Sequence, residues 1–331
     1  MDRLDLRGVP EFVFELLVCR WAELSWPTDG DGVPVVGRQV GTRDRRWDTV
    51  VVEADPEGLA ARARFGVDEL DRDLLRVVRH APAEWAWYRD AIPDPGFPWR
   101  YVREAIDRAA ARGVVERRKR KNRVEIRQIA PYPDWVRRVV AVENKPDLDR
   151  SAARRLGEQL EHDVSRALAD ETWLATAATD DRVEPALLRD IPDEAGILAV
   201  STDDAERASA EVAWHPARLA PDPDDRERRL VVAERVYGRG FRDHVETTRP
   251  DCRHYRLRRR GDAIVPYCAA KERHQTQAEC AWSCDAFEPE PPAWRTRGWP
   301  IEGGPGAACR AVFARRRARR RGQEDEERAK R

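Results

Sequence analysis

Three stretches of consecutive apolar residues constrain the fold of this chain more than any other feature. They lie within residues 47–53 (WDTVVVE), 136–145 (VRRVVAVENK) and 196–201 (GILAVS). Successive side chains of a strand point to opposite faces, so a strand that is apolar without alternation is buried on both faces. Residues 150–168, between the last two stretches, have apolar residues at helical spacing. Strands that alternate with helices predict an α/β domain in which helices flank the sheet.

Residues 68–130 follow a different pattern. Three helical stretches, near 70–78, 85–92 and 99–112, precede two strand-like arms around a turn at 119–122. Helices followed by a basic hairpin resemble a winged helix, the helix-turn-helix variant with a β-wing. Because stretches of the buried-strand type lie on both sides of this segment, we expect it to be a domain inserted into the α/β domain.

The chain therefore divides into parts of different character. We expect the first and second parts of the α/β core at 1–67 and 131–215, the inserted unit at 68–130, a helix with a cysteine-rich metal segment at 216–290, and a disordered basic tail at 291–331.

Acidic residues occupy two of the apolar strands. Asp48 begins one, whereas Glu143 and Lys145 lie two residues apart on another. Alternation places Glu143 and Lys145 on one face and Asn144 on the other. If the strands are neighbours, Asp48 and Glu143 lie close together, and a divalent cation such as Mg²⁺ would relieve their repulsion. Such a cation activates water and polarises a phosphodiester, so the pattern predicts hydrolysis of a nucleic-acid backbone.

The pattern resembles the PD-(D/E)xK nuclease superfamily, which has the restriction-endonuclease-like fold, over residues 10–60 and 131–205. The resemblance implies a mixed sheet flanked by helices. It also implies that Asp48 and Glu143 are ligands of Mg²⁺ or Mn²⁺ and that Lys145 is the catalytic lysine.

Further roles follow from the same resemblance. It implies that the Asn144 carbonyl is a metal ligand, that Glu15 is the acid of the first helix, and that Gln159 is the polar residue of the helix after Lys145. Two features depart from the family pattern. Trp47 stands where a proline usually precedes the aspartate, and 95 residues separate Asp48 from Glu143, which the inserted unit would explain.

A simpler interpretation of these residues involves no catalysis. Glu143 and Lys145 could form a strand-end surface pair worth about 0–1 kcal/mol, with Glu15 and Gln159 as solvated helix residues. The retention of Lys145 favours the catalytic interpretation, since only five of the 61 basic residues are lysines. Lysine has a compact charge and a tunable pKa, whereas arginine stays protonated.

The hairpin of the inserted unit concentrates positive charge in Arg117, Arg118, Lys119, Arg120, Lys121 and Arg123. These cations repel one another unless phosphates or counterions neutralise them. Arg100 and Arg103, on the third helix of the unit, are candidates for phosphate or base-edge contacts. We therefore expect the unit to bind duplex or branched DNA, with protein binding as the alternative.

Four cysteines follow the pattern C-x15-C-x11-C-x3-C, at Cys252, Cys268, Cys280 and Cys284. Four thiolates can complete a tetrahedral Zn²⁺ site, which would stabilise a segment too polar for its own core. Some nucleases of the PD-(D/E)xK superfamily instead carry an iron–sulfur cluster, and Cys19 would then join three of these residues. A buried free thiol is the alternative for Cys19, and Cys309 is expected to be unpaired.

Together these features predict a Mg²⁺-dependent deoxyribonuclease that grips DNA through the inserted unit. The alternatives are a DNA-binding regulator with an inactive nuclease-like scaffold and a protein-interaction adaptor. The arrangement of parts also resembles an uncharacterised family of halophilic archaeal proteins.

The sequence gives no sign of contact with a membrane. No apolar run approaches the roughly 20 residues that a bilayer crossing needs, and the N-terminus shows no cleavage site of a signal peptide. We therefore expect a cytoplasmic protein, with the oligomeric state left open and a homodimer among the options.

Overall fold

The computed structural model describes most of the chain. The described residues are 10–42, 45–148, 150–178, 185–201, 209–220, 226–242, 249–261, 263–275, 278–280 and 284–295. Most of the basic tail predicted at 291–331 lies outside the described residues, and so does Cys309. Among the described residues, no helix is both long enough and apolar enough to cross a membrane.

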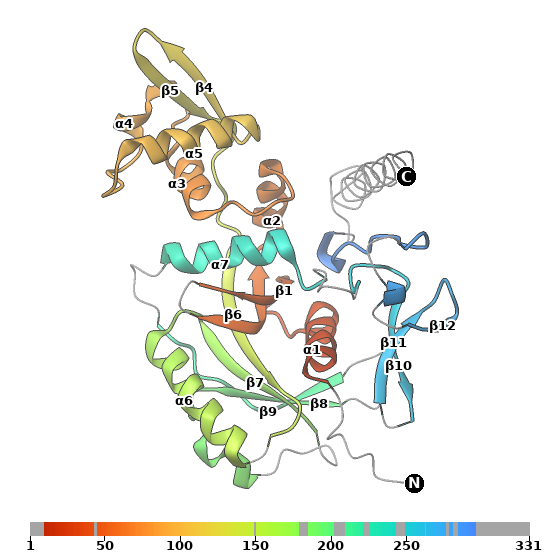
Figure 1. The fold of residues 1–331 in the computed structure, drawn as a ribbon. Helices are drawn as coiled ribbons and strands as arrows, with labels where there is room; N and C mark the ends of the chain where they lie inside the picture. Colours follow the sequence, from red (N-terminus) through yellow and green to blue (C-terminus); the bar gives the residue numbers. More distant parts are fainter. Residues whose placement is uncertain are drawn as a thin grey trace, which may run out of the picture.

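A six-stranded sheet forms the centre of the molecule, in the order β1-β2-β6-β7-β8-β9 (Figure 1). The strands β6, β7 and β8 are parallel, and their neighbours pair antiparallel, so the sheet is mixed as expected. The strands are β1 (Val33–Gly41), β2 (Arg46–Ala54), β6 (Val136–Lys145), β7 (Glu171–Ala177), β8 (Gly196–Ser201) and β9 (Ser209–Trp214).

Helices cover both faces of this sheet. On one face α1 (Glu11–Ser25) packs on Val51, Val140 and Val142. On the other face α7 (Arg226–Arg239) covers Val50, Val52 and Ala141, and α6 (Arg150–Arg166) contributes Leu160 to a cluster with Leu174 and Ile197. The consecutive apolar residues of the strands are thus explained by burial on both sides, which confirms the α/β class.

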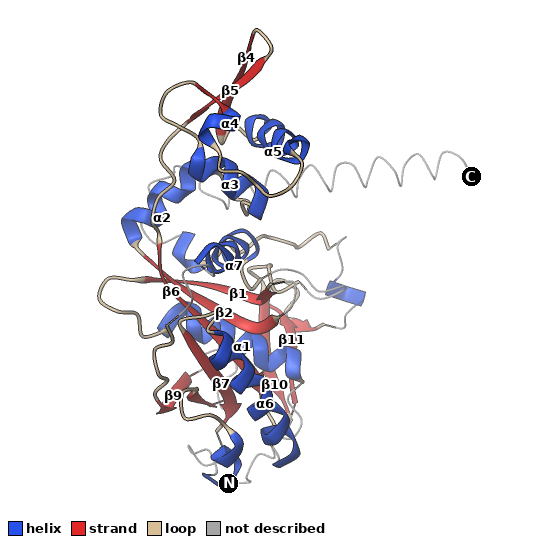
Figure 2. Ribbon diagram, turned by 90° about the vertical axis from the view of Figure 1, so that its left-hand side faces the viewer, coloured by secondary structure: helices blue, strands red, loops and turns tan. Residues whose placement is uncertain are grey.

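Residues 72–128 form a separate unit with its own hydrophobic core. Figures 1 and 2 show it projecting from the end of the molecule beyond α7. Its three-stranded sheet has the order β3-β5-β4. Its elements are α3 (Arg72–His80), β3 (Ala86–Trp87), α4 (Tyr88–Ala91), α5 (Trp99–Ala111), β4 (Val115–Arg120) and β5 (Arg123–Gln128).

The helix expected at 85–92 is only partly correct. Ala86 and Trp87 form strand β3, which pairs with Ile126 and Glu125 of β5, and only Tyr88–Ala91 are helical. The pairing places these residues against the hairpin, a long-range contact that local periodicity does not report. The helix α2 (Pro56–Arg62) and the short turn η1 (Ala63–Phe65), which connect β2 to the unit, were not predicted.

A buried ion pair joins this connection to α7. Arg62 donates to both carboxylate oxygens of Glu234, and both side chains are 0% exposed. The Tyr132 hydroxyl donates to Glu234 as well, at 2.6 Å. This network fixes the chain where it enters and leaves the projecting unit, because Arg62 lies before the unit and Tyr132 after it.

The C-terminal part packs beside α1 (Figure 1). Tyr255, Leu257, Ile264 and Phe287 join the core on the α1 face of the sheet. The elements here are β10 (Tyr255–Arg260), β11 (Ala263–Cys268), β12 (Arg273–His274) and the short turns η4 (Ala278–Cys280) and η5 (Ala293–Arg295); a further turn, η2 (Pro185–Asp190), precedes β8.

Candidate active site

The two strands that carry Asp48 and Glu143 are neighbours. β2 and β6 pair antiparallel with Thr49 opposite Val142, a register that places Asp48 opposite Glu143. The main-chain N–H of Asn144 donates to Asp48 Oδ2 at 3.0 Å. The structure therefore brings together two carboxylates that are 95 residues apart in the sequence.

Burial and the proximity of Asp48 make ionisation of Glu143 unfavourable. Burial and, next in size, the charge of Asp48 together raise the pKa of Glu143 to about 8, against the opposing effect of Arg45. Glu143 is only 5% exposed. Even beside Arg45, a carboxyl group with this pKa holds its proton near neutrality, and a divalent cation would favour its ionised form.

Glu15 approaches Asp48 from the α1 side of the sheet. Gln39 Nε2 donates to Glu15 Oε1 at 3.0 Å and to Asp48 Oδ1 at 2.9 Å, so it bridges the two carboxylates. Arg38 also donates to Glu15, at 3.2 Å. Burial, followed by the charge of Asp48, raises the pKa of Glu15 to about 7. Glu15 is thus a buried member of the site and not a solvated helix residue.

Gln39 reaches both carboxylates because of an irregular backbone. Its φ of 54° lies in the left-handed region, opposite Asp48 in a register that pairs Arg38 with Thr49 and Val40 with Trp47. Glycine and asparagine are the usual residues at such a φ, so the sequence carries no signal for Gln39.

The α6 side of the site contains Gln159, a candidate from the sequence, together with Arg45 and Asp163, which sequence reasoning missed. Gln159 Nε2 donates to Glu143 Oε2 at 2.8 Å, which places Gln159 in the site. Arg45 Nη2 lies 2.5 Å from Glu143 Oε1 and 2.8 Å from Asp163 Oδ2. The indole of Trp47 also donates to Asp163.

Asp163 was detectable in principle because it lies four residues after Gln159, on the same face of α6. Arg45 was not, since nothing distinguishes it from the many other arginines. Trp47 stands where PD-(D/E)xK nucleases usually have a proline, and its indole donates to the buried carboxylate of Asp163.

Lys145 lies at the end of β6, apart from this cluster of bonds. Its Nζ is 3.3 Å from Glu11 Oε1 of α1, and the lysine side chain is about one-third exposed. Strand alternation places Lys145 on the face of Glu143, but as the last residue of the strand it can extend toward α1. A partly exposed ion pair of this kind is weak, so the ammonium can leave Glu11 at little cost.

Asn144 points to the α1 face, as alternation predicts. Its Nδ2 donates to Thr49 Oγ1 at 2.8 Å, and the Cys19 thiol is 3.2 Å from the same hydroxyl. Cys19 is fully buried on α1, and burial raises the pKa of its thiol to about 12. It therefore lies in the core as a protonated thiol.

The chemistry of the donors fits a hard divalent cation. Mg²⁺ commonly binds through one or two carboxylates and completes its coordination with water, and Asp48 and Glu143 offer two. Among the described residues, no group of three or more His, Cys, Asp or Glu side chains is arranged to hold one ion. Arg45 supplies the positive charge beside Glu143 in this structure, so binding of a cation there would displace it.

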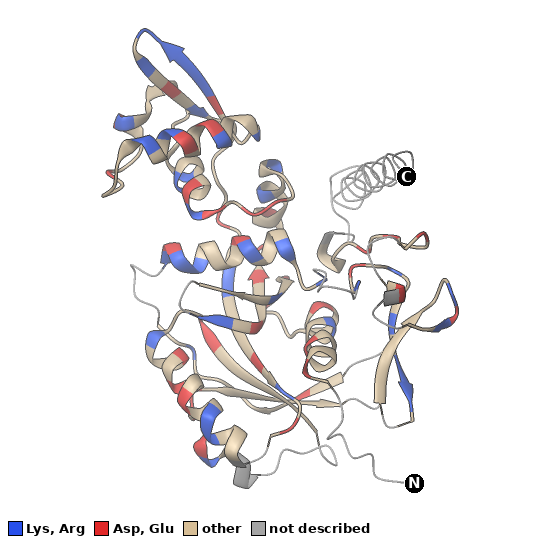
Figure 3. Cartoon of the chain, in the orientation of Figure 1, with Lys and Arg blue, Asp and Glu red and all other residues tan. Residues whose placement is uncertain are grey.

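The hairpin cations of the projecting unit differ in their partners. Arg117 pairs with Asp107 and Arg118 with Glu125. Lys119, Arg120 and Lys121 have no carboxylate partner among the described residues, and Arg123 stacks on Trp87. These four residues are exposed at the tip of the β4–β5 hairpin, where Figure 3 shows a concentration of basic residues, coloured blue.

The exposed face of α5 carries both basic and acidic side chains. Arg100 and Arg103 are exposed as expected, but Glu104 and Asp107 are exposed on the same helix. Arg100 also donates to the Tyr101 hydroxyl at 2.6 Å. Phosphate contacts are therefore better supported at the hairpin tip than on α5.

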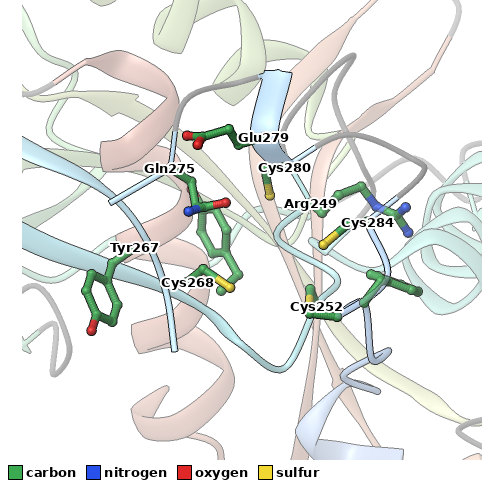
Figure 4. A pocket seen from close by; sticks show the side chains of 11 residues that line it. Arg249, Cys252, Tyr267, Cys268, Gln275, Glu279, Cys280 and Cys284 are labelled. Atoms are coloured by element: carbon green, nitrogen blue, oxygen red, sulfur yellow. The ribbon is translucent and has the colours of Figure 1, made fainter. Parts of the chain in front are cut away.

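The four C-terminal cysteines line one small pocket. Cys252, Cys268, Cys280 and Cys284 are free thiols, and Figure 4 shows their sulfur atoms bordering the same space. Burial raises the pKa of the Cys280 thiol, and the other three cysteines raise it further. Since no metal-binding arrangement of three such side chains exists among the described residues, coordination would require the sulfur atoms to move closer together.

Comparison with known proteins gives a family and no activity. A family model described as "Family of unknown function (DUF5787)" matches residues 35–225 and 220–289. No curated protein and no solved structure matches the chain significantly. Because the match covers more than half of its length, the chain belongs to the DUF5787 family.

Proposed function

We propose that this member of the DUF5787 family is a nuclease that hydrolyses DNA with the help of a divalent cation. One observation carries the proposal: β2 and β6 place Asp48 opposite Glu143. Gln39 links Asp48 to Glu15 by donating to both carboxylates, and Gln159 donates to Glu143. Buried carboxyl groups with raised pKa values, such as Glu15 and Glu143, are a frequent feature of catalytic sites.

The side chains divide the work as follows. Asp48 and Glu143 would hold the cation, which when bound supplies Lewis acidity toward the phosphate and a more acidic water. Gln159 fixes one oxygen of Glu143 through its 2.8 Å hydrogen bond and so limits the rotation of that carboxylate. Lys145, once it leaves Glu11, would place its ammonium beside the phosphate and stabilise the developing negative charge.

The projecting unit would hold the DNA. Its helices and its three-stranded sheet of order β3-β5-β4 support the proposal that it is a winged helix, and Lys119, Arg120 and Lys121 are exposed at the hairpin tip, where they could contact phosphates. Neutralised phosphates release counterions, so this binding should weaken steeply as salt rises.

A cleavage assay tests the proposal. The wild type is incubated with linear, nicked and branched DNA and with Mg²⁺, Mn²⁺ or no divalent cation. We expect cation-dependent cutting that Lys145→Ala abolishes while DNA binding stays intact. Arg137→Ala is the matched control, because Arg137 lies at the other end of β6 and pairs with Asp31 and Asp55. Failure of the wild type to cut any substrate with any cation would reject the proposal.

A second candidate, a DNA-binding regulator with an inactive nuclease-like scaffold, is favoured by one contact. Arg45 bridges Glu143 and Asp163 at 2.5 and 2.8 Å, an ion pair that stabilises the site without a metal. Salt-dependent DNA binding together with absence of cutting, and absence of any effect of Mn²⁺ on stability, would support this alternative.

We also propose that the cysteine pocket holds Zn²⁺. Cys19, which an iron–sulfur cluster would recruit, is bonded to Thr49 in the core, whereas four other cysteines share one pocket. Metal analysis should find one zinc per chain, lost in Cys268→Ser and retained in Cys19→Ser. Iron with acid-labile sulfide and visible absorption, lost in Cys19→Ser, would reject zinc.

A further inference from the structure

A second concave site lies on the other side of α1 from the carboxylates. It is a groove of about 520 Å³ between the C-terminal half of α1 and the C-terminal part of the chain. Arg20 of α1 lines it, and five residues at 100° each turn Arg20 about 140° away from Glu15. The charged residues of the groove are Arg20, Glu23, Arg242, Arg253, Arg256 and Glu290, together with His254.

The buried acid of the groove is already neutralised. Glu23 is 2% exposed, and Arg242 donates to both of its oxygens in a bidentate pair. Glu23 Oε1 also accepts from the main-chain N–H of Ala293 at 2.7 Å. The charges of Glu23 and Arg242 cancel, so neither attracts a further ion strongly.

Arg20 and Arg256 lack such compensation. The Nε of Arg20 is buried and has no hydrogen-bond partner among the described residues. Within the part of the chain that the structure describes, Arg256 Nη1 donates to two main-chain carbonyls, those of Arg253 and Tyr255, and to no carboxylate. Arg253 pairs with Glu288 at 3.3 Å, but both side chains are about half exposed, and such a pair is weak. The groove thus has a surplus of positive charge, with guanidinium groups available to a ligand.

We propose that this groove binds phosphate groups of a DNA strand. A guanidinium fork matches the geometry of phosphate oxygens, and the groove is lined by four arginines against two glutamates. The groove is large enough for more than an isolated ion, which favours a polymer of phosphates. The identification of the polymer as DNA rests on the proposed function, whereas the affinity for phosphate does not.

Binding measurements test the groove without any need for catalysis. Fluorescence anisotropy of a labelled single-stranded oligonucleotide is recorded over a range of salt concentrations, with no divalent cation added, for the wild type and for Arg20→Gln/Arg256→Gln. Loss of two phosphate contacts should lower the slope of log affinity against log salt by about 1.4 and weaken binding at least about tenfold. Arg137→Gln, an exposed arginine on β6, is the control and should leave both quantities unchanged.

The outcomes separate the groove from the rest of the molecule. An unchanged slope and affinity in the double variant, or absence of oligonucleotide binding by the wild type, would overturn the proposal. A third outcome would also overturn it: inorganic phosphate or a mononucleotide stabilises the wild type through Arg20 and Arg256, but oligonucleotide binding does not depend on these two residues. Failure to cleave DNA would reject the nuclease and leave this measurement untouched.

Discussion

Replacement of Glu143 by glutamine should stabilise the protein at alkaline pH. The pKa of Glu143 is raised from 4.5 to about 8, so between these values the folded protein keeps a proton that the unfolded chain releases. The free energy of unfolding therefore falls as pH rises, by 1.36 kcal/mol for each unit of difference, or roughly 5 kcal/mol in total. Glutamine keeps the shape and removes the charge, so Glu143→Gln escapes this loss.

Urea unfolding followed by tryptophan fluorescence measures the effect, at pH 4.5 and pH 9 without divalent cations. We expect similar stability of the two proteins at pH 4.5 and a large advantage of the variant at pH 9. Glu15 titrates in both proteins, so its contribution largely cancels in the comparison. A difference in unfolding free energy that is the same at both pH values would refute the argument that folding raises the pKa of Glu143.

Other perturbations have equally definite outcomes. Saturation with Mg²⁺ at about 100 times its Kd should stabilise the wild type by about 2.7 kcal/mol at pH 9 and leave the glutamine variant unchanged, as thermal unfolding can show. Arg45→Met should destabilise the protein by about 3–5 kcal/mol, because it leaves Asp163, which is 2% exposed, as an unpaired buried charge. Addition of Asp163→Asn to this variant should restore most of the lost stability. A double variant as unstable as Arg45→Met alone would contradict the pairing. Lys119→Gln/Lys121→Gln should lower the slope of log affinity against log salt for duplex DNA by about 1.8. Arg117→Gln removes a cation already paired with Asp107 and should change this slope less. Equal effects of the two variants in binding titrations would contradict DNA binding by the hairpin tip.

The sequence was sufficient for the α/β class, whereas the pairing of the Asp48 and Glu143 strands was only assumed and is supplied by the structure. Runs such as Val50–Val52 report burial on both faces directly, and Asp48 and Glu143 could be placed at strand ends. Gln159 was singled out only through the resemblance to the PD-(D/E)xK superfamily, and the structure places it in contact with Glu143.

The features that the sequence did not reveal depend on long-range contacts. The left-handed φ of Gln39, the bridge made by Arg45 and the pairing of β3 with β5 are set by neighbours distant in the chain. The groove near Arg20 also needs α1 to meet a distant part of the chain that contributes Arg242, Arg253 and Arg256. Periodicity and propensity report only the local chain, so none of these could be read from it.

The most direct test is a crystal structure of the protein soaked with Mn²⁺, with an anomalous difference map. If Asp48 and Glu143 hold a divalent cation, the map should show a peak within about 2.0–2.6 Å of oxygens from both carboxylates, with Arg45 moved away from Glu143. No peak at saturating Mn²⁺, with Arg45 still bonded to Glu143, would contradict the account.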